Sequence, residues 1–173
     1  MGIVLVKKPK YWIISTIPPL ILILDQWTKS LVTDKFQLGE SVSIIREFFN
    51  LTYIRNPGAA FGIFAQSHPS FRGPFFMLIP LVALVVIGTV FRKLPANSRL
   101  LSSALSLVIG GAIGNLIDRV RFGYVVDFLD FHWRYGYHFP AFNVADSAIC
   151  VGVGILILDI LLQPEKQNAS ATS

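Results

Sequence analysis

Long apolar stretches separated by polar segments dominate the pattern of this chain. Each stretch approaches the ~20 residues that a helix needs to cross ~30 Å of hydrocarbon. The pattern therefore predicts an α-helical integral membrane protein with four transmembrane helices, forming a single membrane domain over residues 1–173. The predicted spans are about 11–31, which has polar interruptions from Asp25 onward, 74–91, 100–117 and 141–162.

The segments between these spans differ in length and in their density of positive charge. Residues 1–10, 92–99 and 163–173 are short and together hold seven lysines and arginines. Residues 32–73 and 118–140 also hold seven but are much longer, so only the density of positive charge separates the two sides. Lysine and arginine concentrate in short cytoplasmic loops. We therefore expect both termini in the cytoplasm and the two long segments outside it. Because no small-residue cleavage site follows the first stretch, we expect a retained span and not a removed signal peptide.

The two long outer segments differ in character. Residues 48–64 read FFNLTYIRNPGAAFGIF, in which β-branched and aromatic residues precede an Asn-Pro-Gly turn signal. This favours a small extracytoplasmic β-sheet or hairpin, although an irregular loop also fits. Residues 119–140 are crowded with phenylalanine, tyrosine and tryptophan. That composition is typical of a loop lying in the headgroup layer, so we predict an interfacial aromatic loop there.

Composition narrows the class of protein. Hydrophobic residues make up 53% of the 173 residues and charged residues only 14%, too few charges for a soluble domain to cover its apolar surface. The net charge of +5 is scattered along the chain, so no nucleic-acid partner is expected. Cys150 is the one cysteine, which excludes an internal disulfide and a thiolate metal site. The three histidines lack a ligand spacing, so neither a metal nor another cofactor is predicted.

Two aspartates are the leading candidates for chemistry. Asp127 lies in the motif VVDF and Asp146 in FNVAD, on either side of the point where the chain enters the fourth span. Charged side chains near a bilayer are costly and usually functional. Two carboxylates held close together share one proton, which provides a base for water and an acid for a carbonyl. Alternatively, they are unrelated carboxylates at helix starts, where aspartate is favoured.

Asparagines accompany two of the acids. Asn115 precedes Asp118 by three residues, as Asn143 precedes Asp146. At this spacing both side chains lie on one helix face, so the amide can orient a nearby carboxylate, although two matches can also arise by chance. Arg119 either complements the dipole of the third helix or pairs with an acid. Its planar guanidinium also suits a substrate carbonyl or a lipid phosphate.

Two further features predict structural support. Asp25 and Lys29 have the i,i+4 spacing of a favourable ion pair, which would brace the first helix near the membrane surface. Gly110, Gly111 and Gly114 include the small-xxx-small spacing that lets membrane helices approach closely. Close packing there would bring the third helix near a neighbour, as a pair of aspartates from separate segments requires.

Other functional classes remain open from the residues alone. A proton-coupled transporter also uses intramembrane acids, but these usually lie at the midplane, whereas the acids here lie at one boundary. A non-catalytic assembly subunit could use the ion pair and the glycines for helix contacts. The sequence has no phosphate-binding loop, no GxSxG motif and no HExxH motif.

Five segments together resemble the lipoprotein signal peptidase family, the bacterial signal peptidase II. The resemblance covers the chain from the first span to the last, in the order and spacing of the family. The segments are DQWTK (25–29), IRNPGAAFGIF (54–64), GGAIGNLIDR (110–119), VVDF (125–128) and FNVADSAI (142–149).

The resemblance implies an aspartic endopeptidase of the bacterial inner membrane, active at its outer face. Such an enzyme removes the signal peptide from prolipoproteins on the N-terminal side of a diacylglyceryl-modified cysteine. Membrane lipid and a globomycin-type inhibitor are further implied ligands, and we expect a monomer without a cofactor. By motif position, the resemblance assigns catalysis to Asp127 and Asp146, substrate binding to Asn56, Asn115, Arg119 and Asn143, and structural support to Asp25, Lys29, Gly111 and Asp118.

Overall fold

Four long helices and a small β-sheet form the described part of the computed structural model, which covers residues 8–58, 68–133 and 137–162. The first three helices extend beyond the predicted apolar stretches at both ends, and the fourth begins three residues later than predicted. The helices are α1 (Pro9–Lys35), α2 (Pro69–Lys93), α3 (Arg99–Phe122) and α4 (Val144–Leu161).

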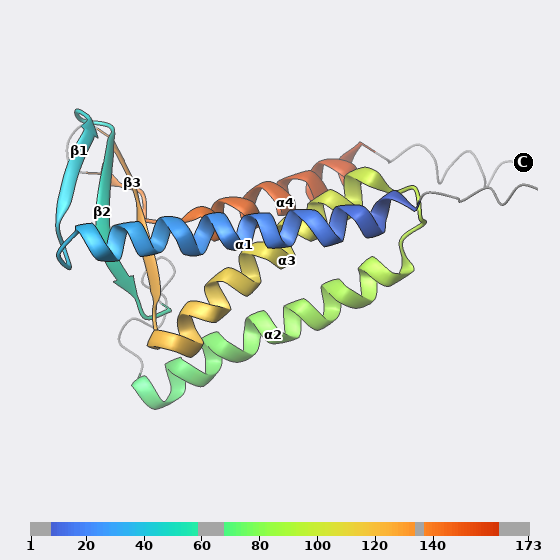
Figure 1. The fold of residues 1–173 in the computed structure, drawn as a ribbon, viewed down its shortest axis with the longest axis horizontal. Coiled ribbons are helices and arrows are strands. Elements are labelled where there is room, and N and C mark those ends of the chain that lie inside the picture. The colour runs from blue at the N-terminus through green and yellow to red at the C-terminus, as the bar shows by residue number, and fades with distance from the viewer. Residues whose placement is uncertain (1–7, 59–67, 134–136, 163–173) are drawn as a thin grey trace, which may run out of the picture.

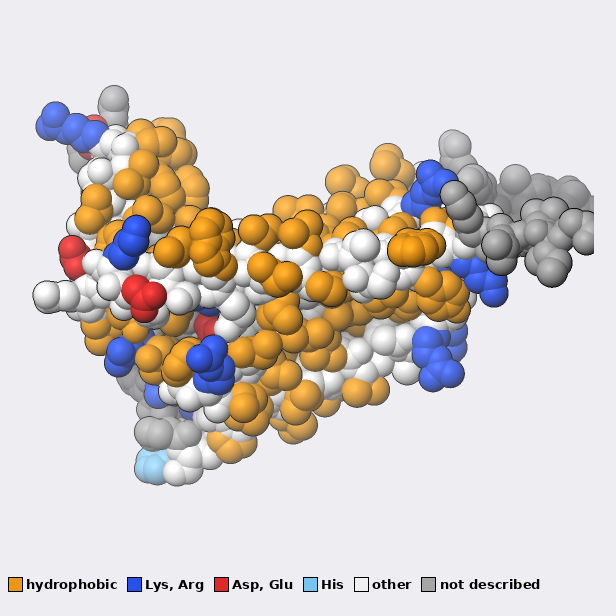
Figure 2. All heavy atoms as spheres, viewed as in Figure 1, with side chains coloured by type: hydrophobic (Ala, Val, Ile, Leu, Met, Phe, Trp, Pro, Cys, Tyr) orange, Lys and Arg blue, Asp and Glu red, His pale blue; other side chains and the backbone are white. Residues whose placement is uncertain are grey.

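Within the described residues, three helices are long and apolar enough to cross a membrane. They are α2 from Ser70 to Lys93, α3 and α4. Figure 2 shows apolar side chains along the helices, with lysine and arginine gathered toward their ends. Helix α1 is not in this group; it buries Asp25 and Lys29 inside the bundle. The structure thus supports three of the predicted crossings, and a crossing by α1 stays a prediction.

Helix α3 is the centre of the bundle, with α4 and α1 packed extensively against it and α2 less so. Glycines allow the closest approaches. A Cβ atom at Gly110 would lie 3.0 Å from Pro18 Cα of α1, and one at Gly152 of α4 would lie 2.6 Å from the Ala104 carbonyl oxygen. Without a hydrophobic driving force between helices in lipid, such small-residue contacts are a main source of helix association.

The sheet lies across one end of the bundle (Figure 1). Neighbouring strands are antiparallel and follow the order β1-β2-β3-β4. Helix α1 begins and α4 ends at the opposite end of the bundle. The predicted small sheet is therefore present. The strands are β1 (Ser41–Ile45), β2 (Phe49–Asn56), β3 (Val125–Trp133) and β4 (Tyr137–His138).

The prediction of an aromatic loop over residues 119–140 is wrong for most of the segment. Helix α3 continues to Phe122, and Gly123 ends it in a left-handed conformation with φ of 77°. The chain then forms β3, which pairs with β2, and its Val126 and Phe128 join a buried core with Val32. Aromatic and β-branched residues favour a pleated, half-buried surface as readily as an interface, which explains the error.

Candidate active site

Asp127 and Asp146 meet at a shared asparagine. Asp127 lies on β3 opposite Ile54 of β2, and Asp146 lies in the first turn of α4. Asn143 Nδ2 donates a hydrogen bond of 2.7 Å to Asp127 Oδ1. The backbone N–H of Asn143 donates to Asp146 Oδ2 over 3.2 Å. The structure therefore brings the two predicted carboxylates to the same residue.

The start of α4 explains this position of Asp146. Asn143 is the N-cap, and its Oδ1 accepts a hydrogen bond of 2.9 Å from the Asp146 backbone N–H. With the reciprocal bond to Asp146 Oδ2, the two residues form a capping box, which satisfies two otherwise unpaired N–H groups. Because Asn143 Oδ1 is engaged by the helix, its Nδ2 is left to face Asp127. The Asn-x-x-Asp spacing therefore reflects a helix cap that orients both carboxylates.

Asn115 holds Asp146 from the other side. Its Nδ2 donates to Asp146 Oδ1 over 2.7 Å, and its Oδ1 accepts from Lys29 Nζ over 3.0 Å and from Asn143 Nδ2 over 3.2 Å. A protonated lysine can only donate, so the amide orientation of Asn115 is determined. The predicted pairing with a carboxylate is thus present, but the partner is Asp146 of α4 and not the neighbouring Asp118.

Asn56, at the end of β2, binds the second oxygen of Asp127. Its Nδ2 donates to Asp127 Oδ2 over 2.9 Å, while its Oδ1 accepts from the Gly58 N–H, also over 2.9 Å. Gly58 has a φ of 111°, a conformation that L-residues rarely adopt. The predicted Asn-Pro-Gly turn therefore fixes the Asn56 amide as a donor. The remainder of the predicted segment, residues 59–64, lies outside the described residues.

The two carboxylates differ in their access to water. The Asp127 side chain is deeply buried, with only 2% of the residue exposed, whereas Asp146 is half-buried. Burial, and then the negative charge of Asp146, raise the pKa of Asp127 to about 7, against the opposing amides of Asn56 and Asn143. Asp127 therefore holds a proton more readily near neutral pH than an ordinary aspartate does. One proton shared by two acids is the state needed for acid–base chemistry on an amide.

A buried ion network lies beside the pair of aspartates. Lys29 Nζ lies 2.8 Å from Asp25 Oδ2 and 3.0 Å from Asp118 Oδ2, and all three residues are at most 3% exposed. The predicted i,i+4 pair is thus confirmed, with Asp118 of α3 as a further partner. Gln26 was not among the predicted residues, yet its Nε2 donates to Asp118 Oδ1 over 2.8 Å. Its place inside the motif DQWTK was the available signal.

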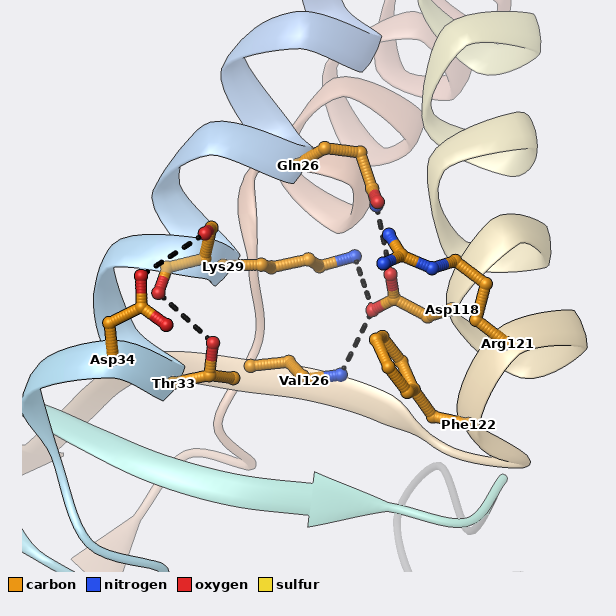
Figure 3. Close-up of a pocket in the computed structure, with 9 residues that line it drawn as sticks. Gln26, Lys29, Thr33, Asp34, Asp118, Arg121, Phe122 and Val126 are labelled. Atoms are coloured by element: carbon orange, nitrogen blue, oxygen red, sulfur yellow. Dashed lines mark hydrogen bonds and ion pairs between the residues drawn. The ribbon is translucent and has the colours of Figure 1, made fainter.

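A cavity of about 230 Å³ reaches this network between α1, α3 and β3 (Figure 3). In the close-up, the Lys29 side chain extends across it toward Asp118. Nine residues line the cavity: Gln26, Lys29, Ser30, Thr33, Asp34, Asp118, Arg121, Phe122 and Val126. Neither Asp127 nor Asp146 is among them, so this cavity is separate from the paired carboxylates.

Arg119 lies on α3, one turn beyond Asn115. Its Nη1 donates to the Asn115 carbonyl oxygen over 3.3 Å. Its Nε is buried and has no hydrogen-bond partner among the described residues. A buried guanidinium nitrogen without a partner is costly, which points to a ligand that fills the position. The predicted alternative of a structural ion pair is not seen in the part of the chain that the structure describes.

Gly111 places α3 directly against the first turn of α4. A Cβ atom at this position would overlap the Ala145 carbonyl oxygen and would lie 2.8 Å from Ile149 Cγ1. Gly114, one turn further, would bring a Cβ to 2.7 Å from Asp25 Oδ2. The glycines therefore permit the close contact of α3 and α4 on which the hydrogen bond from Asn115 to Asp146 depends.

This chain is similar to known proteins over most of its length. A family model described as signal peptidase (SPase) II matches residues 17–162. A lipoprotein signal peptidase of Geobacter metallireducens is 48% identical over 161 residues, covering 93% of this chain and 98% of the relative. Another, from Syntrophotalea carbinolica, is 52% identical over 152 residues, covering 88% of this chain and 92% of the relative.

A solved structure shows a similar fold. It is described as a bacterial membrane enzyme, is 37% identical in sequence and superimposes with a TM-score of 0.77. The match covers 88% of this chain and 89% of that one. The helices and the sheet of this chain therefore have a counterpart in a membrane enzyme.

Proposed function

This chain belongs to the signal peptidase II family, and on that basis we propose that it removes the signal peptide from diacylglyceryl-modified prolipoproteins. Cleavage falls on the N-terminal side of the lipidated cysteine, and the catalytic type is aspartic. The observation that carries the aspartic type is the pairing of Asp127 and Asp146 through Asn143. The alternative of a proton-coupled transporter gains no support from the relatives, which are named as peptidases.

The different surroundings of the two carboxylates suggest their roles. Asp146 is half-buried in the first turn of α4, so water can reach its carboxylate more readily than that of the deeply buried Asp127. It takes a proton from a water molecule, whose oxygen bonds to the scissile carbonyl carbon. Asp127, which holds the shared proton, donates a hydrogen bond to the carbonyl oxygen. The tetrahedral intermediate collapses as the C–N bond breaks, and the leaving amine takes up the proton that Asp146 removed from water. Because water is the nucleophile, no acyl-enzyme forms.

Asn56 and Arg119 are placed to hold the substrate peptide. Asn56 adjoins Asp127 directly, and the unpartnered Nε of Arg119 is available to a peptide carbonyl or a lipid phosphate. We assign the binding of a globomycin-type inhibitor to the same residues. Asn115 and Asn143 hold the carboxylates in position beside the substrate.

The membrane placement completes the proposal. Helix α1 provides the fourth crossing. Its Asp25 and Lys29 face the bundle interior, where they pair and do not contact lipid. Both termini are cytoplasmic, and the sheet and the aspartates lie at the outer face of the bacterial inner membrane. A substrate anchored by acyl chains then presents its cleavage site at the depth of Asp127 and Asp146. The protein acts as a monomer.

A cleavage assay with purified protein tests the function. We expect a precursor carrying a diacylglyceryl cysteine to be cut without an ion gradient or a partner protein, giving a product whose first residue is the lipidated cysteine by mass spectrometry. The same precursor without the lipid should be cut at least ~10²-fold more slowly, because the acyl anchor supplies the positioning. A globomycin-type inhibitor should stop cleavage. Equal rates on both precursors would contradict the proposed substrate.

The pH dependence follows from the raised pKa of Asp127. A raised carboxyl pKa means that the proton is held up to about pH 7 and is lost above it, which leaves two ionised carboxylates and no acid. We therefore expect kcat to fall above pH 7, approaching tenfold per pH unit. Replacing Asn56 by Ala removes a hydrogen bond that stabilises the ionised form, so this limb should move to higher pH. A kcat that stays constant from pH 6.5 to 9 would contradict the assignment of the proton.

A further inference from the structure

The acids of the buried ion network bind the backbone directly beside the two candidate catalytic aspartates. Asp25 Oδ1 accepts a hydrogen bond of 3.0 Å from the N–H of Ala145, the residue before Asp146. Asp118 Oδ2 accepts one of 3.1 Å from the N–H of Val126, the residue before Asp127. The same kind of contact therefore fixes the chain at both aspartates, one on α4 and the other on β3.

Lys29 connects these two attachments. Its Nζ bonds to both Asp25 and Asp118, and Figure 3 shows it reaching across the cavity to the oxygen of Asp118 that also receives the Val126 N–H. Transfer of a charge into a buried site costs several kcal/mol before pairing, and apolar residues often fill such a site as well or better. Stability alone is therefore a poor explanation for three charges at this position.

A third bond from Lys29 reaches the carboxylate pair itself. Nζ donates to Asn115 Oδ1, which leaves the Asn115 Nδ2 to donate to Asp146 Oδ1. Without Lys29, the Asn115 amide loses a donor that determines its orientation. Lys29 therefore acts on Asp127 through Asp118 and Val126, and on Asp146 through Asp25, Ala145 and Asn115.

We propose that Lys29, with Asp25 and Asp118, is a positioning unit that sets the separation and orientation of Asp127 and Asp146. The unit touches no substrate in this proposal, which depends on the peptidase function proposed above. Its three side chains come from α1 and α3, whereas the aspartates that it positions lie on β3 and α4. Hydrogen bonds and ion pairs from surrounding side chains of this kind hold a catalytic pair within the narrow geometry that the reaction requires.

Removing the charge of Lys29 should change the pH dependence of kcat, which a loss of packing alone would not do. The charged groups around Lys29 and Asp127 include Asp25 on α1, Asp118 and Arg119 on α3, and Asp146 on α4. The positive charge of Lys29 lowers the pKa of Asp127. Removing this charge should therefore raise that pKa, and the alkaline limb of the kcat profile should move to higher pH.

The experiment compares two buried lysines of the same helix in the lipidated-precursor assay. Lys29→Met is expected to lower kcat by at least ~30-fold with KM within about twofold, because substrate contacts are unchanged while the acids are misplaced. Its alkaline limb should move upward, and Lys29→Arg should restore the position of that limb. Lys10→Met is the matched control: Lys10 is 5% exposed and bonds to the Leu94 and Arg92 carbonyls. This control should lose thermal stability but keep the wild-type kcat and pH profile.

Asp118→Asn is a second variant that tests the proposal if Lys29→Met fails to fold. It keeps the shape of the Asp118 side chain and removes its charge. It too should lower kcat while leaving KM nearly unchanged. Wild-type kcat in Lys29→Met or Asp118→Asn would overturn the positioning role, as would a loss expressed only in KM or only in thermal stability. Failure of the peptidase function itself is recognised separately, because the wild-type protein would then leave the lipidated precursor uncut. Wild-type activity in both the Asp127→Asn and the Asp146→Asn variants would instead exclude the aspartic mechanism.

Discussion

Replacement of either Asp127 or Asp146 by Asn is expected to abolish cleavage of a lipidated precursor, with a loss of at least ~10³-fold in kcat. An amide keeps the size of the side chain and can still accept a hydrogen bond from Asn143 or Asn115. It cannot hold the shared proton or remove one from water at neutral pH. The loss should appear in kcat with folding and membrane level unchanged, because the change is confined to the reacting groups.

Two other aspartates on the same elements provide matched controls. Asp130 lies on β3 and accepts a hydrogen bond of 3.1 Å from Asn50 Nδ2, while Asp159 lies near the far end of α4. Asp130→Asn and Asp159→Asn should retain kcat within about threefold, since neither carboxylate belongs to the pair. Wild-type cleavage by both the Asp127 and the Asp146 variants would exclude the aspartic mechanism. Equal losses in all four variants would indicate a general effect of removing a carboxylate.

Gly111→Ala is expected to cause the second large effect, on both stability and activity. The added methyl group would overlap the Ala145 carbonyl oxygen, which is backbone and cannot move without shifting α4. Overpacking of this kind costs about 1–3 kcal/mol and should lower the temperature of unfolding. Because Ala145 precedes Asp146, the shift also moves a carboxylate that we propose to be catalytic, and a displacement of ~1 Å can cost ~10²-fold in rate.

Gly154→Ala is the matched control for this glycine. A Cβ atom at Gly154 of α4 would have no atom within 4 Å, so the residue should tolerate alanine with an unchanged unfolding temperature and kcat. Both quantities can be measured on detergent-solubilised protein by thermal denaturation and by precursor cleavage. If Gly111→Ala keeps wild-type stability and kcat, the close contact of α3 and α4 does not control the position of Asp146.

The sequence predicted the parts of this molecule that depend on local pattern. Apolar runs of span length located the four helices, and the cost of burying charge singled out Asp127 and Asp146. The spacing of Asp25 and Lys29 predicted their ion pair. These features are readable because hydrophobic periodicity and short spacings are properties of the chain itself.

Contacts between elements could not be predicted in the same way. The spacing of Asn115 and Asp118 suggested a local pair, yet Asn115 bonds to Asp146 and Asp118 bonds to Lys29. Such partners depend on how α1, α3 and α4 pack together. The spacing of residues within one short segment does not predict that packing. The strand β3 was missed for a related reason, because its pairing with β2 required a partner far away in the sequence.

The network around Lys29 has a consequence for the stage of synthesis at which the protein becomes active. Its members come from α1 and α3, whereas Asp146, one of the two aspartates that the network is proposed to position, lies on α4, the final helix of the chain. A growing polypeptide that has inserted only its earlier segments therefore contains no complete set of reacting groups. Proteolytic competence would begin only after the whole bundle has closed, so that half-made copies stay harmless to other chains emerging beside them.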